Sequence, residues 1–296
     1  MTSLSHQITS DLYTVWWETS TPISSSNVTA SMSHLHSRHT HSSPIVQQSI
    51  AEVWNARKAG NTKLFNGTKF RLGDLTATTT TDLHLRMSVT DYASYLGTNW
   101  NKSLQPSILQ RKHMADTLGV GAVVVTSDQY IIFIKRSEHV GEFPNCLDVP
   151  GGHPEPSRVT GCHGTAWEYT EEKDVALNDA LISSNDLVSE FFNSIVDEVY
   201  EEINIPKNKL NENQLLMIMR QTEPNGKPSA VFQLACELTK EEVEACYAKG
   251  PEEAFESTAL VFMSTTDVQN IPVNDMRKDM TPACIGSLLK WREVNE

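Results

Sequence analysis

Residues 147–156 read Leu147-Asp148-Val149-Pro150-Gly151-Gly152-His153-Pro154-Glu155-Pro156. The two consecutive glycines allow a tight turn in which backbone carbonyl groups are exposed. Two apolar, β-prone runs come just before this turn, at 119–126 and 130–136, and a short polar segment separates them. This arrangement predicts a β-hairpin followed by a glycine turn.

An acidic stretch follows at 197–205 and reads Asp197-Glu198-Val199-Tyr200-Glu201-Glu202-Ile203-Asn204-Ile205. On a helix, Glu198, Glu201 and Glu202 are related by three and four residues and share one face. Like charges at that spacing repel each other, so we expect a positive charge to compensate them. A divalent hard cation, which prefers carboxylate oxygens, is the natural candidate. A solvated acidic helix face is the alternative explanation.

Hydrophobic periodicity predicts the remaining elements. Strands are expected at 11–17, 63–72, 82–90, 119–126, 130–136, 214–222, 229–237 and 258–263, and helices at 46–59, 91–96, 186–203, 239–247 and 282–293. The Ser-, Thr- and His-rich segment 19–49 is expected to be a loop. Residues 153–185 have no strong period, so they are interpreted as an insertion. We expect one domain at 1–115 and a second at 116–296.

The composition indicates an ordinary globular protein with an acidic surface. The 296 residues contain 24 Lys and Arg against 37 Asp and Glu, which gives a formal net charge of −13. Such a charge argues against nucleic acid or an anionic membrane as the main partner, but it allows a small phosphate ligand. The sequence does not indicate an oligomeric state.

The absence of targeting signals in the sequence and its cysteine pattern lead us to expect a cytoplasmic location, or also a nuclear one. No apolar run approaches the length of a membrane span, and the first residues lack the basic and apolar segments of a signal peptide. The five cysteines are widely spaced and form no Cys-x-x-Cys pair, which favours reduced thiols. The histidines of segment 34–41 could hold zinc, but a solvated loop is the favoured interpretation.

The glycine turn and the acidic helix together resemble the box of the Nudix hydrolases, G-x5-E-x7-R-E-U-x-E-E-x-G-U, in which U is aliphatic. Gly152 matches the first glycine of the box. The matches to its metal-binding glutamates are Glu198, Glu201 and Glu202, and the aliphatic positions are occupied by Val199 and Ile205.

The chain departs from this pattern in several places. Gly152 and Glu198 are 46 positions apart instead of 15, so 31 residues are inserted. Asp197 replaces the arginine of the box, and Asn204 replaces its late glycine. Glu190 lies one residue from the place of the early glutamate. In the family, that arginine and that glutamate support the loop and helix more than they bind metal.

A wider resemblance, to the UDP-glucose pyrophosphatases of this family in animals, covers nearly the whole chain. It is carried by residues 54–57, 63–65, 69–72, 96–100, 118–122, 148–156 and 256–258. The resemblance implies a Nudix α/β/α sandwich with an additional N-terminal α+β domain. It also implies Mg²⁺-dependent hydrolysis of UDP-glucose and UDP-galactose to UMP and the sugar 1-phosphate.

The same resemblance implies the residues of the site. The catalytic residues would be Glu198, Glu201, Glu202 and Glu256. Mg²⁺ would be held by Glu198, Glu201, Glu202 and the carbonyl of Gly151. The substrate would contact Phe65, Tyr92, Arg136, Gly141, Asp148, His153 and Glu155.

Each assigned role has a chemical reason. Phe65 and Tyr92 could stack on uracil, although core packing is their ordinary role. Arg136 offers a planar fork for phosphate. Asp148, His153 and Glu155 could hold hydroxyl groups or a second metal ion. Glu256 could be the general base or merely a capping or solvated residue, and Lys69 and Arg71 could face the diphosphate or be strand residues.

Two other functions remain open from the sequence. One is a Nudix hydrolase for another nucleoside diphosphate derivative, such as ADP-ribose or a dinucleotide. The other is a catalytically silent Nudix domain that binds a nucleotide. The three retained glutamates speak against the silent domain, because it has no need of mutually repelling carboxylates.

Overall fold

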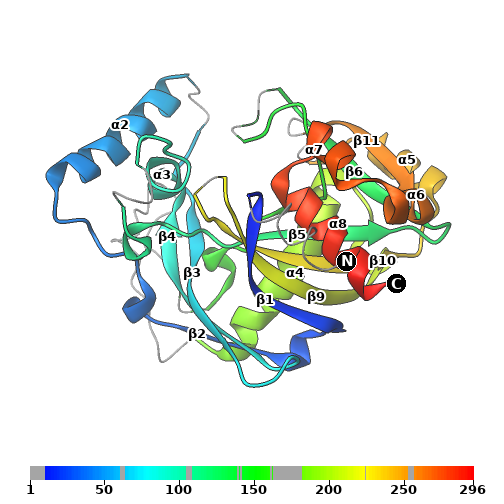
Figure 1. The fold of residues 1–296 in the computed structure, drawn as a ribbon, viewed down its shortest axis with the longest axis horizontal. Helices are drawn as coiled ribbons and strands as arrows, with labels where there is room; N and C mark the ends of the chain where they lie inside the picture. The colour runs from blue at the N-terminus through cyan, green and yellow to red at the C-terminus, as the bar shows by residue number, and fades with distance from the viewer. Residues whose placement is uncertain are drawn as a thin grey trace.

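The fold is built on one large mixed sheet (Figure 1). The computed structural model describes residues 11–60, 64–104, 109–138, 140, 142–160, 162, 182–223, 225–252 and 257–296. Within these residues, eight strands form a sheet with the order β1-β9-β10-β5-β6-β11, while β7 pairs with β6 and β8 with β5. The strands span Tyr13–Ile23 (β1), Gly119–Val125 (β5), Tyr130–Arg136 (β6), Leu147–Asp148 (β7), Gly151–Gly152 (β8), Leu210–Gln221 (β9), Pro228–Cys236 (β10) and Ser257–Ser264 (β11).

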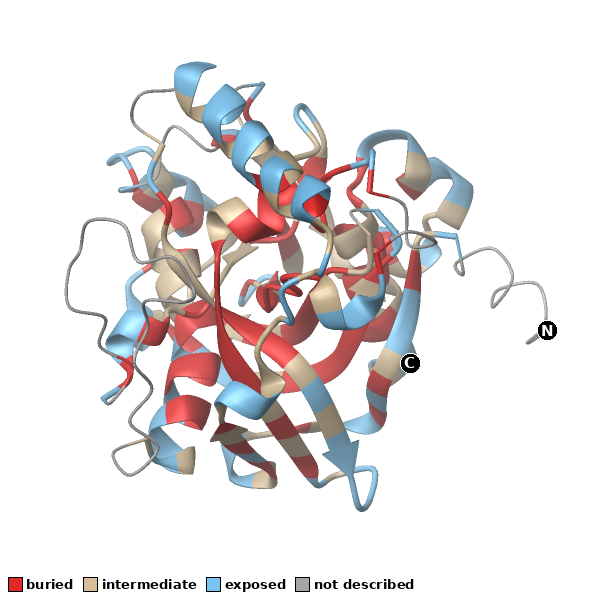
Figure 2. Ribbon diagram, turned by 90° about the vertical axis from the view of Figure 1, so that its left-hand side faces the viewer, coloured by how far each residue is buried: buried red, intermediate tan, exposed pale blue. Residues whose placement is uncertain are grey.

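Helices cover both faces of this sheet. Helix α4 (Ser184–Ile203) packs on one face, where Phe191, Ile195 and Val199 join a cluster with sheet residues such as Phe232. Helix α8 (Pro282–Val294) packs on the other face, where Leu288 belongs to a second cluster. Figure 2 shows the buried residues concentrated between these layers. The large sheet is therefore the middle layer of an α/β/α sandwich.

Shorter helices complete the described chain around the large sheet. They span Lys240–Tyr247 (α5), Thr265–Asn270 (α6) and Val273–Asp279 (α7). Helix α5 begins with a capping box, in which Thr239 and Glu242 each bond the other's backbone N–H. The predictions for α4, α5 and α8 are confirmed, whereas α6 and α7 are too short to show a clear period in the sequence.

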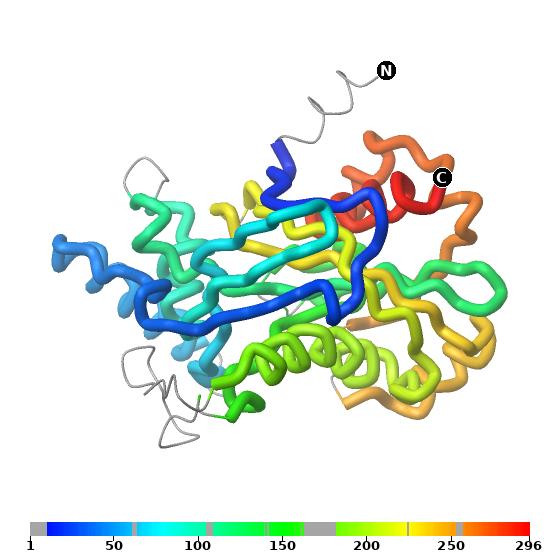
Figure 3. Tube along the Cα trace, turned by 90° about the horizontal axis from the view of Figure 1, so that it is seen from below, coloured from blue at the N-terminus to red at the C-terminus, as the bar shows by residue number. Residues whose placement is uncertain are grey.

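A second, three-stranded sheet lies beside the first one (Figure 3). Its order is β2-β4-β3, with strands at Val28–Met32 (β2), Thr68–Ala77 (β3) and Leu83–Asp91 (β4). Helices α2 (Pro44–Gly60) and α3 (Tyr92–Gly97) follow β2 and β4 in the chain. Short 3₁₀ turns occupy Ser25–Asn27, His34–His36, Arg111–His113, Pro156–Arg158 and Lys207–Lys209.

The prediction of a loop throughout 19–49 is wrong. Strand β1 continues to Ile23, and β2 forms at Val28–Met32. In β2 the small or flexible residues Val28, Ala30 and Met32 alternate inward, and they pair with β4. The segment's Ser and Thr residues hid this period of two, because tertiary pairing decides strand formation in weakly apolar segments.

The two sheets share a hydrophobic core. One buried cluster contains Phe70 and Leu85 of the small sheet together with Leu118 and Phe232 of the large one. Strand β1 also pairs with β9, although it lies before the expected boundary between residues 115 and 116. The division into two domains stays a prediction, and most of the predicted insertion at 153–185 lies outside the described residues.

Two further observations concern the chain as a whole. The five cysteines are free thiols, and four of them are buried. No helix in the described part of the chain is both long and apolar enough to cross a membrane.

Candidate active site

The C-terminal turns of α4 meet the glycine turn at β8. Glu202 is 1% exposed, and its Oε2 accepts a hydrogen bond of 2.9 Å from the Gly151 N–H. One turn earlier, the Oε1 of Glu198 accepts a hydrogen bond of 2.9 Å from the His153 N–H. The structure thus brings together two carboxylates and a turn that the sequence separates by more than 40 positions.

Both positions of this turn require glycine, because neighbouring atoms lie too close to allow a Cβ atom. A Cβ atom on Gly152 would overlap the Glu198 carboxylate, and one on Gly151 would overlap the Val120 carbonyl oxygen. Strand β8 pairs with β5 at these positions, which fixes the turn against the sheet. Only glycine lets the backbone lie this close to both the sheet and the carboxylate.

Helix α4 reaches this position because its sequence sets both of its ends. At its start, the Ser183 side chain accepts a hydrogen bond from the Asp186 N–H. At its end, Asn204 has a φ of 66°, a left-handed conformation that asparagine tolerates. Asn204 therefore performs the conformational task that a late glycine would perform.

An arginine from the loop replaces the arginine that the helix lacks. Asp197 bonds the Arg158 guanidinium, and its other oxygen lies 2.5 Å from the Lys207 ammonium. Arg158 Nη2 lies 3.4 Å from Glu201 Oε1. An ion pair thus joins the loop to the helix, with the acidic residue on the helix. The role of Glu201 as a metal ligand stays a prediction, and its carboxylate faces Arg158.

Glu190 fastens the same loop further along. It is 8% exposed, and its Oε1 accepts a hydrogen bond of 2.7 Å from the Glu155 N–H. Burial raises the pKa of Glu190 to about 7, although this hydrogen bond and the nearby Arg158 act in the opposite direction. Glu190 supports the loop from a position one residue away from the early glutamate of the box.

Replacing Glu190 by Gln should make the protein more stable at pH 8 but not at pH 4. The folded-state pKa of about 7 exceeds the ordinary value of 4.5. The unfolded chain therefore loses this proton first, and stability falls as pH rises from about 4.5 to about 7. Gln keeps the acceptor oxygen and cannot titrate, so the gain at pH 8 should reach at most about 3 kcal/mol.

Urea unfolding of both proteins at the two pH values measures this effect. The Glu237→Gln variant is a control of opposite sign, because a hydrogen bond from Lys209 lowers the pKa of Glu237. An equal stability change at pH 4 and pH 8 for Glu190→Gln would contradict the prediction.

The oxygen donors at the turn fit a small divalent cation. Among the described residues, no group of three or more His, Cys, Asp or Glu side chains could enclose a metal ion. Mg²⁺ does not need such a cage, because it commonly binds one or two carboxylates, waters and substrate phosphates. The Glu198 and Glu202 carboxylates meet that requirement, and the space for one of them depends on a glycine.

Basic side chains also lie near His153. The Nη1 of Arg136 lies 3.5 Å from Asp148 Oδ2, and Thr281 donates a hydrogen bond of 2.7 Å to Asp148 Oδ1. Burial raises the pKa of Asp148, while Arg136 lowers it. Burial, followed by the positive charges of Lys227, Lys69 and Arg136, holds the pKa of His153 well below its ordinary value of 6.5. Burial and the nearby cations thus disfavour the protonated form of His153.

Trp54, Tyr92 and Tyr95 form an aromatic platform at the edge of the small sheet. The Tyr92 ring stacks on Tyr95 with centroids 6.1 Å apart and meets Trp54 edge-on at 6.5 Å. Phe65 is 75% exposed and is therefore not a core residue. Segment 65–67 is tied to α3, because Gly67 accepts a hydrogen bond from the Tyr92 N–H. The backbone of segment 65–67 therefore lies beside the start of α3, and the assignment of Phe65 and Tyr92 to the base stays a prediction.

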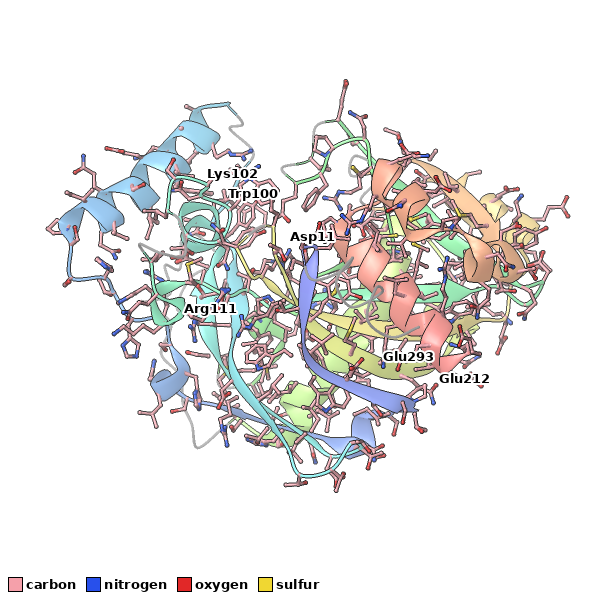
Figure 4. All side chains as sticks on the ribbon, viewed as in Figure 1. Asp11, Trp100, Lys102, Arg111, Glu212 and Glu293 are labelled. Atoms are coloured by element: carbon pink, nitrogen blue, oxygen red, sulfur yellow. The ribbon has the colours of Figure 1, made fainter. Side chains whose placement is uncertain are left out.

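This edge faces the loop that follows β6. Trp100 contacts Phe143 edge-on, with centroids 5.8 Å apart, and Figure 4 shows Trp100 on the side of the small sheet that faces the large one. Tyr95 and the Glu142 carboxylate interact at the same junction. The platform and the glycine turn therefore belong to one continuous region.

Some of the other predicted site residues lie elsewhere in the fold, and some lie outside the described residues. Arg71 is buried and donates hydrogen bonds to the carbonyl groups of Met114 and His36, which makes it a structural residue. Lys69 contributes to the charge near His153. Gly141 and Glu256 lie outside the described residues, so their roles stay predictions. The histidines of segment 34–41 belong to no group of three or more potential metal ligands among the described residues.

Three residues of this region could not be identified from sequence patterns. Lys227 follows the turn between β9 and β10, Glu142 lies in the loop after β6, and Tyr95 is in α3. Each belongs to a short segment without a motif, and only the fold brings them together.

Relatives share most of the chain's length. The uridine diphosphate glucose pyrophosphatase NUDT22 of Mus musculus is 34% identical over 280 residues, which are 91% of this chain and 86% of the relative. The protein of the same name from Homo sapiens is 32% identical over 279 residues, covering 90% and 88%. Nudix hydrolase 9 of Arabidopsis thaliana is 35% identical over 262 residues, covering 83% and 81%. The chain belongs to the Nudix hydrolase family.

As a Nudix hydrolase, the chain is an enzyme that acts on a diphosphate bond. Nudix hydrolases act on small nucleotide substrates and generally use divalent metal ions, which agrees with the oxygen donors at the glycine turn. No protein-family model matches the chain. The residues inserted between Gly152 and Glu198 divide the Nudix box, so its two halves meet only in the folded protein.

Proposed function

We propose that this Nudix hydrolase converts UDP-glucose and UDP-galactose to UMP and the sugar 1-phosphate with Mg²⁺. The observation that carries the proposal is the meeting of Glu198 and Glu202 with the turn at Gly151 and His153. Relatives named as uridine diphosphate glucose pyrophosphatases, at 34% and 32% identity, support the choice of substrate.

One group of residues would bind the metal ion and promote the hydrolysis, and another would bind the substrate. Bound Mg²⁺ would supply positive charge that neutralises the diphosphate. Glu198 and Glu202 would hold that ion, with Gly151 and Glu201 as further predicted ligands. Water adds to one phosphorus, the bridging P–O bond breaks, and the two phosphate esters separate. Glu256 is the predicted general base.

The remaining predicted contacts position the substrate. Arg136 is held by Asp148 and by the Glu142 carbonyl, to which its Nε donates a hydrogen bond of 3.0 Å. This fixes the guanidinium beside His153, where it would bind a phosphate. The rest of the nucleotide sugar would be surrounded by Asp148, His153, Glu155 and Gly141. The uracil ring would stack on Phe65 and Tyr92.

Release of UMP from UDP-glucose, measured with Mg²⁺ and with a chelator, tests this function. We expect turnover with Mg²⁺ and almost none with the chelator. UDP-galactose and ADP-ribose should be measured in parallel. A clear preference for ADP-ribose would contradict the assignment of the base, whereas binding without any hydrolysis would indicate a silent site.

The Tyr92→Ala change should weaken UMP binding about tenfold or more. A ring stacked on a base contributes on the order of 1–3 kcal/mol, and about 1.4 kcal/mol is a factor of ten in affinity. If Tyr92 only positions the nucleoside, KM should rise more than kcat falls. Calorimetric titration with UMP measures the affinity. Unchanged affinity for UMP in a folded Tyr92→Ala protein would show that Tyr92 only packs against its neighbours and does not contact the base.

A further inference from the structure

A buried lysine stands between the aromatic platform and the glycine turn. Lys227 is 8% exposed, although it comes directly after the turn between β9 and β10. Its Cε lies 3.3 Å from the position of a Cβ built on Gly119, and the same position is 3.6 Å from the Gly152 carbonyl oxygen. The ammonium lies 5.2 Å from the centre of the Tyr95 ring. Lys227 therefore reaches both halves of the region.

Lys227 brings positive charge to the glycine turn, because its Cε lies close to Gly119, which is next to the Gly152 carbonyl oxygen. Its Nζ is 3.6 Å from Glu142 Oε2, and the Glu142 carbonyl accepts a hydrogen bond from Arg136 Nε. Lys227 and Arg136 thus both lie near the turn, in a protein whose formal net charge is −13. Such a concentration of positive charge at a turn fits an anion with more than one negative charge.

The ion pair that holds Lys227 is loose. Its Nζ lies 3.6 Å from Glu142 Oε2, which is longer than a hydrogen bond. Glu142 also has a second interaction partner, because the Tyr95 hydroxyl faces its carboxylate. That hydroxyl is buried and has no hydrogen-bond partner in ordinary geometry. A buried hydroxyl without a partner is costly, so Glu142 can accept from Tyr95 when Lys227 turns to another anion.

We propose that Lys227 is a catalytic residue that binds the diphosphate of the substrate, and that Glu142 holds its ammonium until the substrate arrives. The inference rests on the proposed function for the identity of the nucleotide, while the diphosphate follows from the family. An ammonium group carries three donors on a flexible stem, which suits a phosphate that gains charge during cleavage.

Inorganic pyrophosphate with excess Mg²⁺ is the probe, because it lacks both base and sugar. Lys227→Met keeps the length of the side chain and removes its charge, so pyrophosphate affinity should fall about 10-fold to 100-fold. Glu142→Gln removes the competing anion, so affinity should stay equal or rise. If the pair were only structural, both variants would lose affinity together.

The two variants test the inference in opposite directions. Unchanged pyrophosphate affinity in folded Lys227→Met would overturn it, and so would reduced affinity in folded Glu142→Gln. The second variant decides the matter if Lys227→Met does not fold. In parallel, kcat/KM for UDP-glucose should fall in Lys227→Met. Wild-type protein that binds pyrophosphate but does not cleave UDP-glucose would overturn the proposed function and leave the role of Lys227 intact.

Discussion

The Glu202→Gln protein is expected to hydrolyse UDP-glucose at least about 100-fold more slowly than the wild type at saturating Mg²⁺. Gln has the same shape and keeps an oxygen that can accept from the Gly151 N–H, so the turn should retain its position. It lacks the negative charge that binds a hard cation. Losing charge stabilisation at a reacting phosphate costs two or more orders of magnitude in comparable sites.

Initial rates over a range of Mg²⁺ concentrations measure this effect, together with thermal unfolding. The matched control is Glu244→Gln, the same chemical change in a helix, at a carboxylate 51% exposed. This control should keep the wild-type rate. Near wild-type turnover in a folded Glu202→Gln protein would show that Glu202 is not a metal ligand.

The Asp116→Asn change should lower the free energy of unfolding by about 3–5 kcal/mol. Asp116 is 1% exposed and lies at the junction of the two sheets. Its carboxylate is 2.5 Å from Arg111 Nη1, 3.4 Å from Arg220 Nη1 and 3.9 Å from Arg71 Nη2, and Figure 4 shows Arg111 beside the small sheet. Asn would leave three guanidinium groups near one another without the carboxylate between them.

Asparagine is the appropriate replacement because Asp116 has a φ of 45°, a left-handed conformation that Asn tolerates. The control is Asp74→Asn, which breaks an exposed pair with Arg86 and should cost less than about 1 kcal/mol. Urea unfolding of the three proteins measures both effects. A loss for Asp116→Asn no greater than that of the control would contradict the prediction.

Local patterns in the sequence were enough to predict much of the framework. The hairpin of β5 and β6, the long helix α4 and the final helix α8 follow from periodicity and capping residues, which act within a few positions of the chain. The glutamates of α4 were also identifiable, because their spacing on one helix face needs no tertiary information. The same patterns missed β2, whose small and polar residues become a strand only by pairing with β4.

Motifs and local patterns were thus enough to identify the family, the helix that carries the glutamates and the glycine turn that they meet. The other residues of the site come together only when the chain folds. Arg158 pairs with Asp197 across the insertion, Lys227 comes from a distant turn, and Phe65 is exposed. Helix and turn preferences are local, whereas ion pairs and exposure depend on which segments the folded chain brings together.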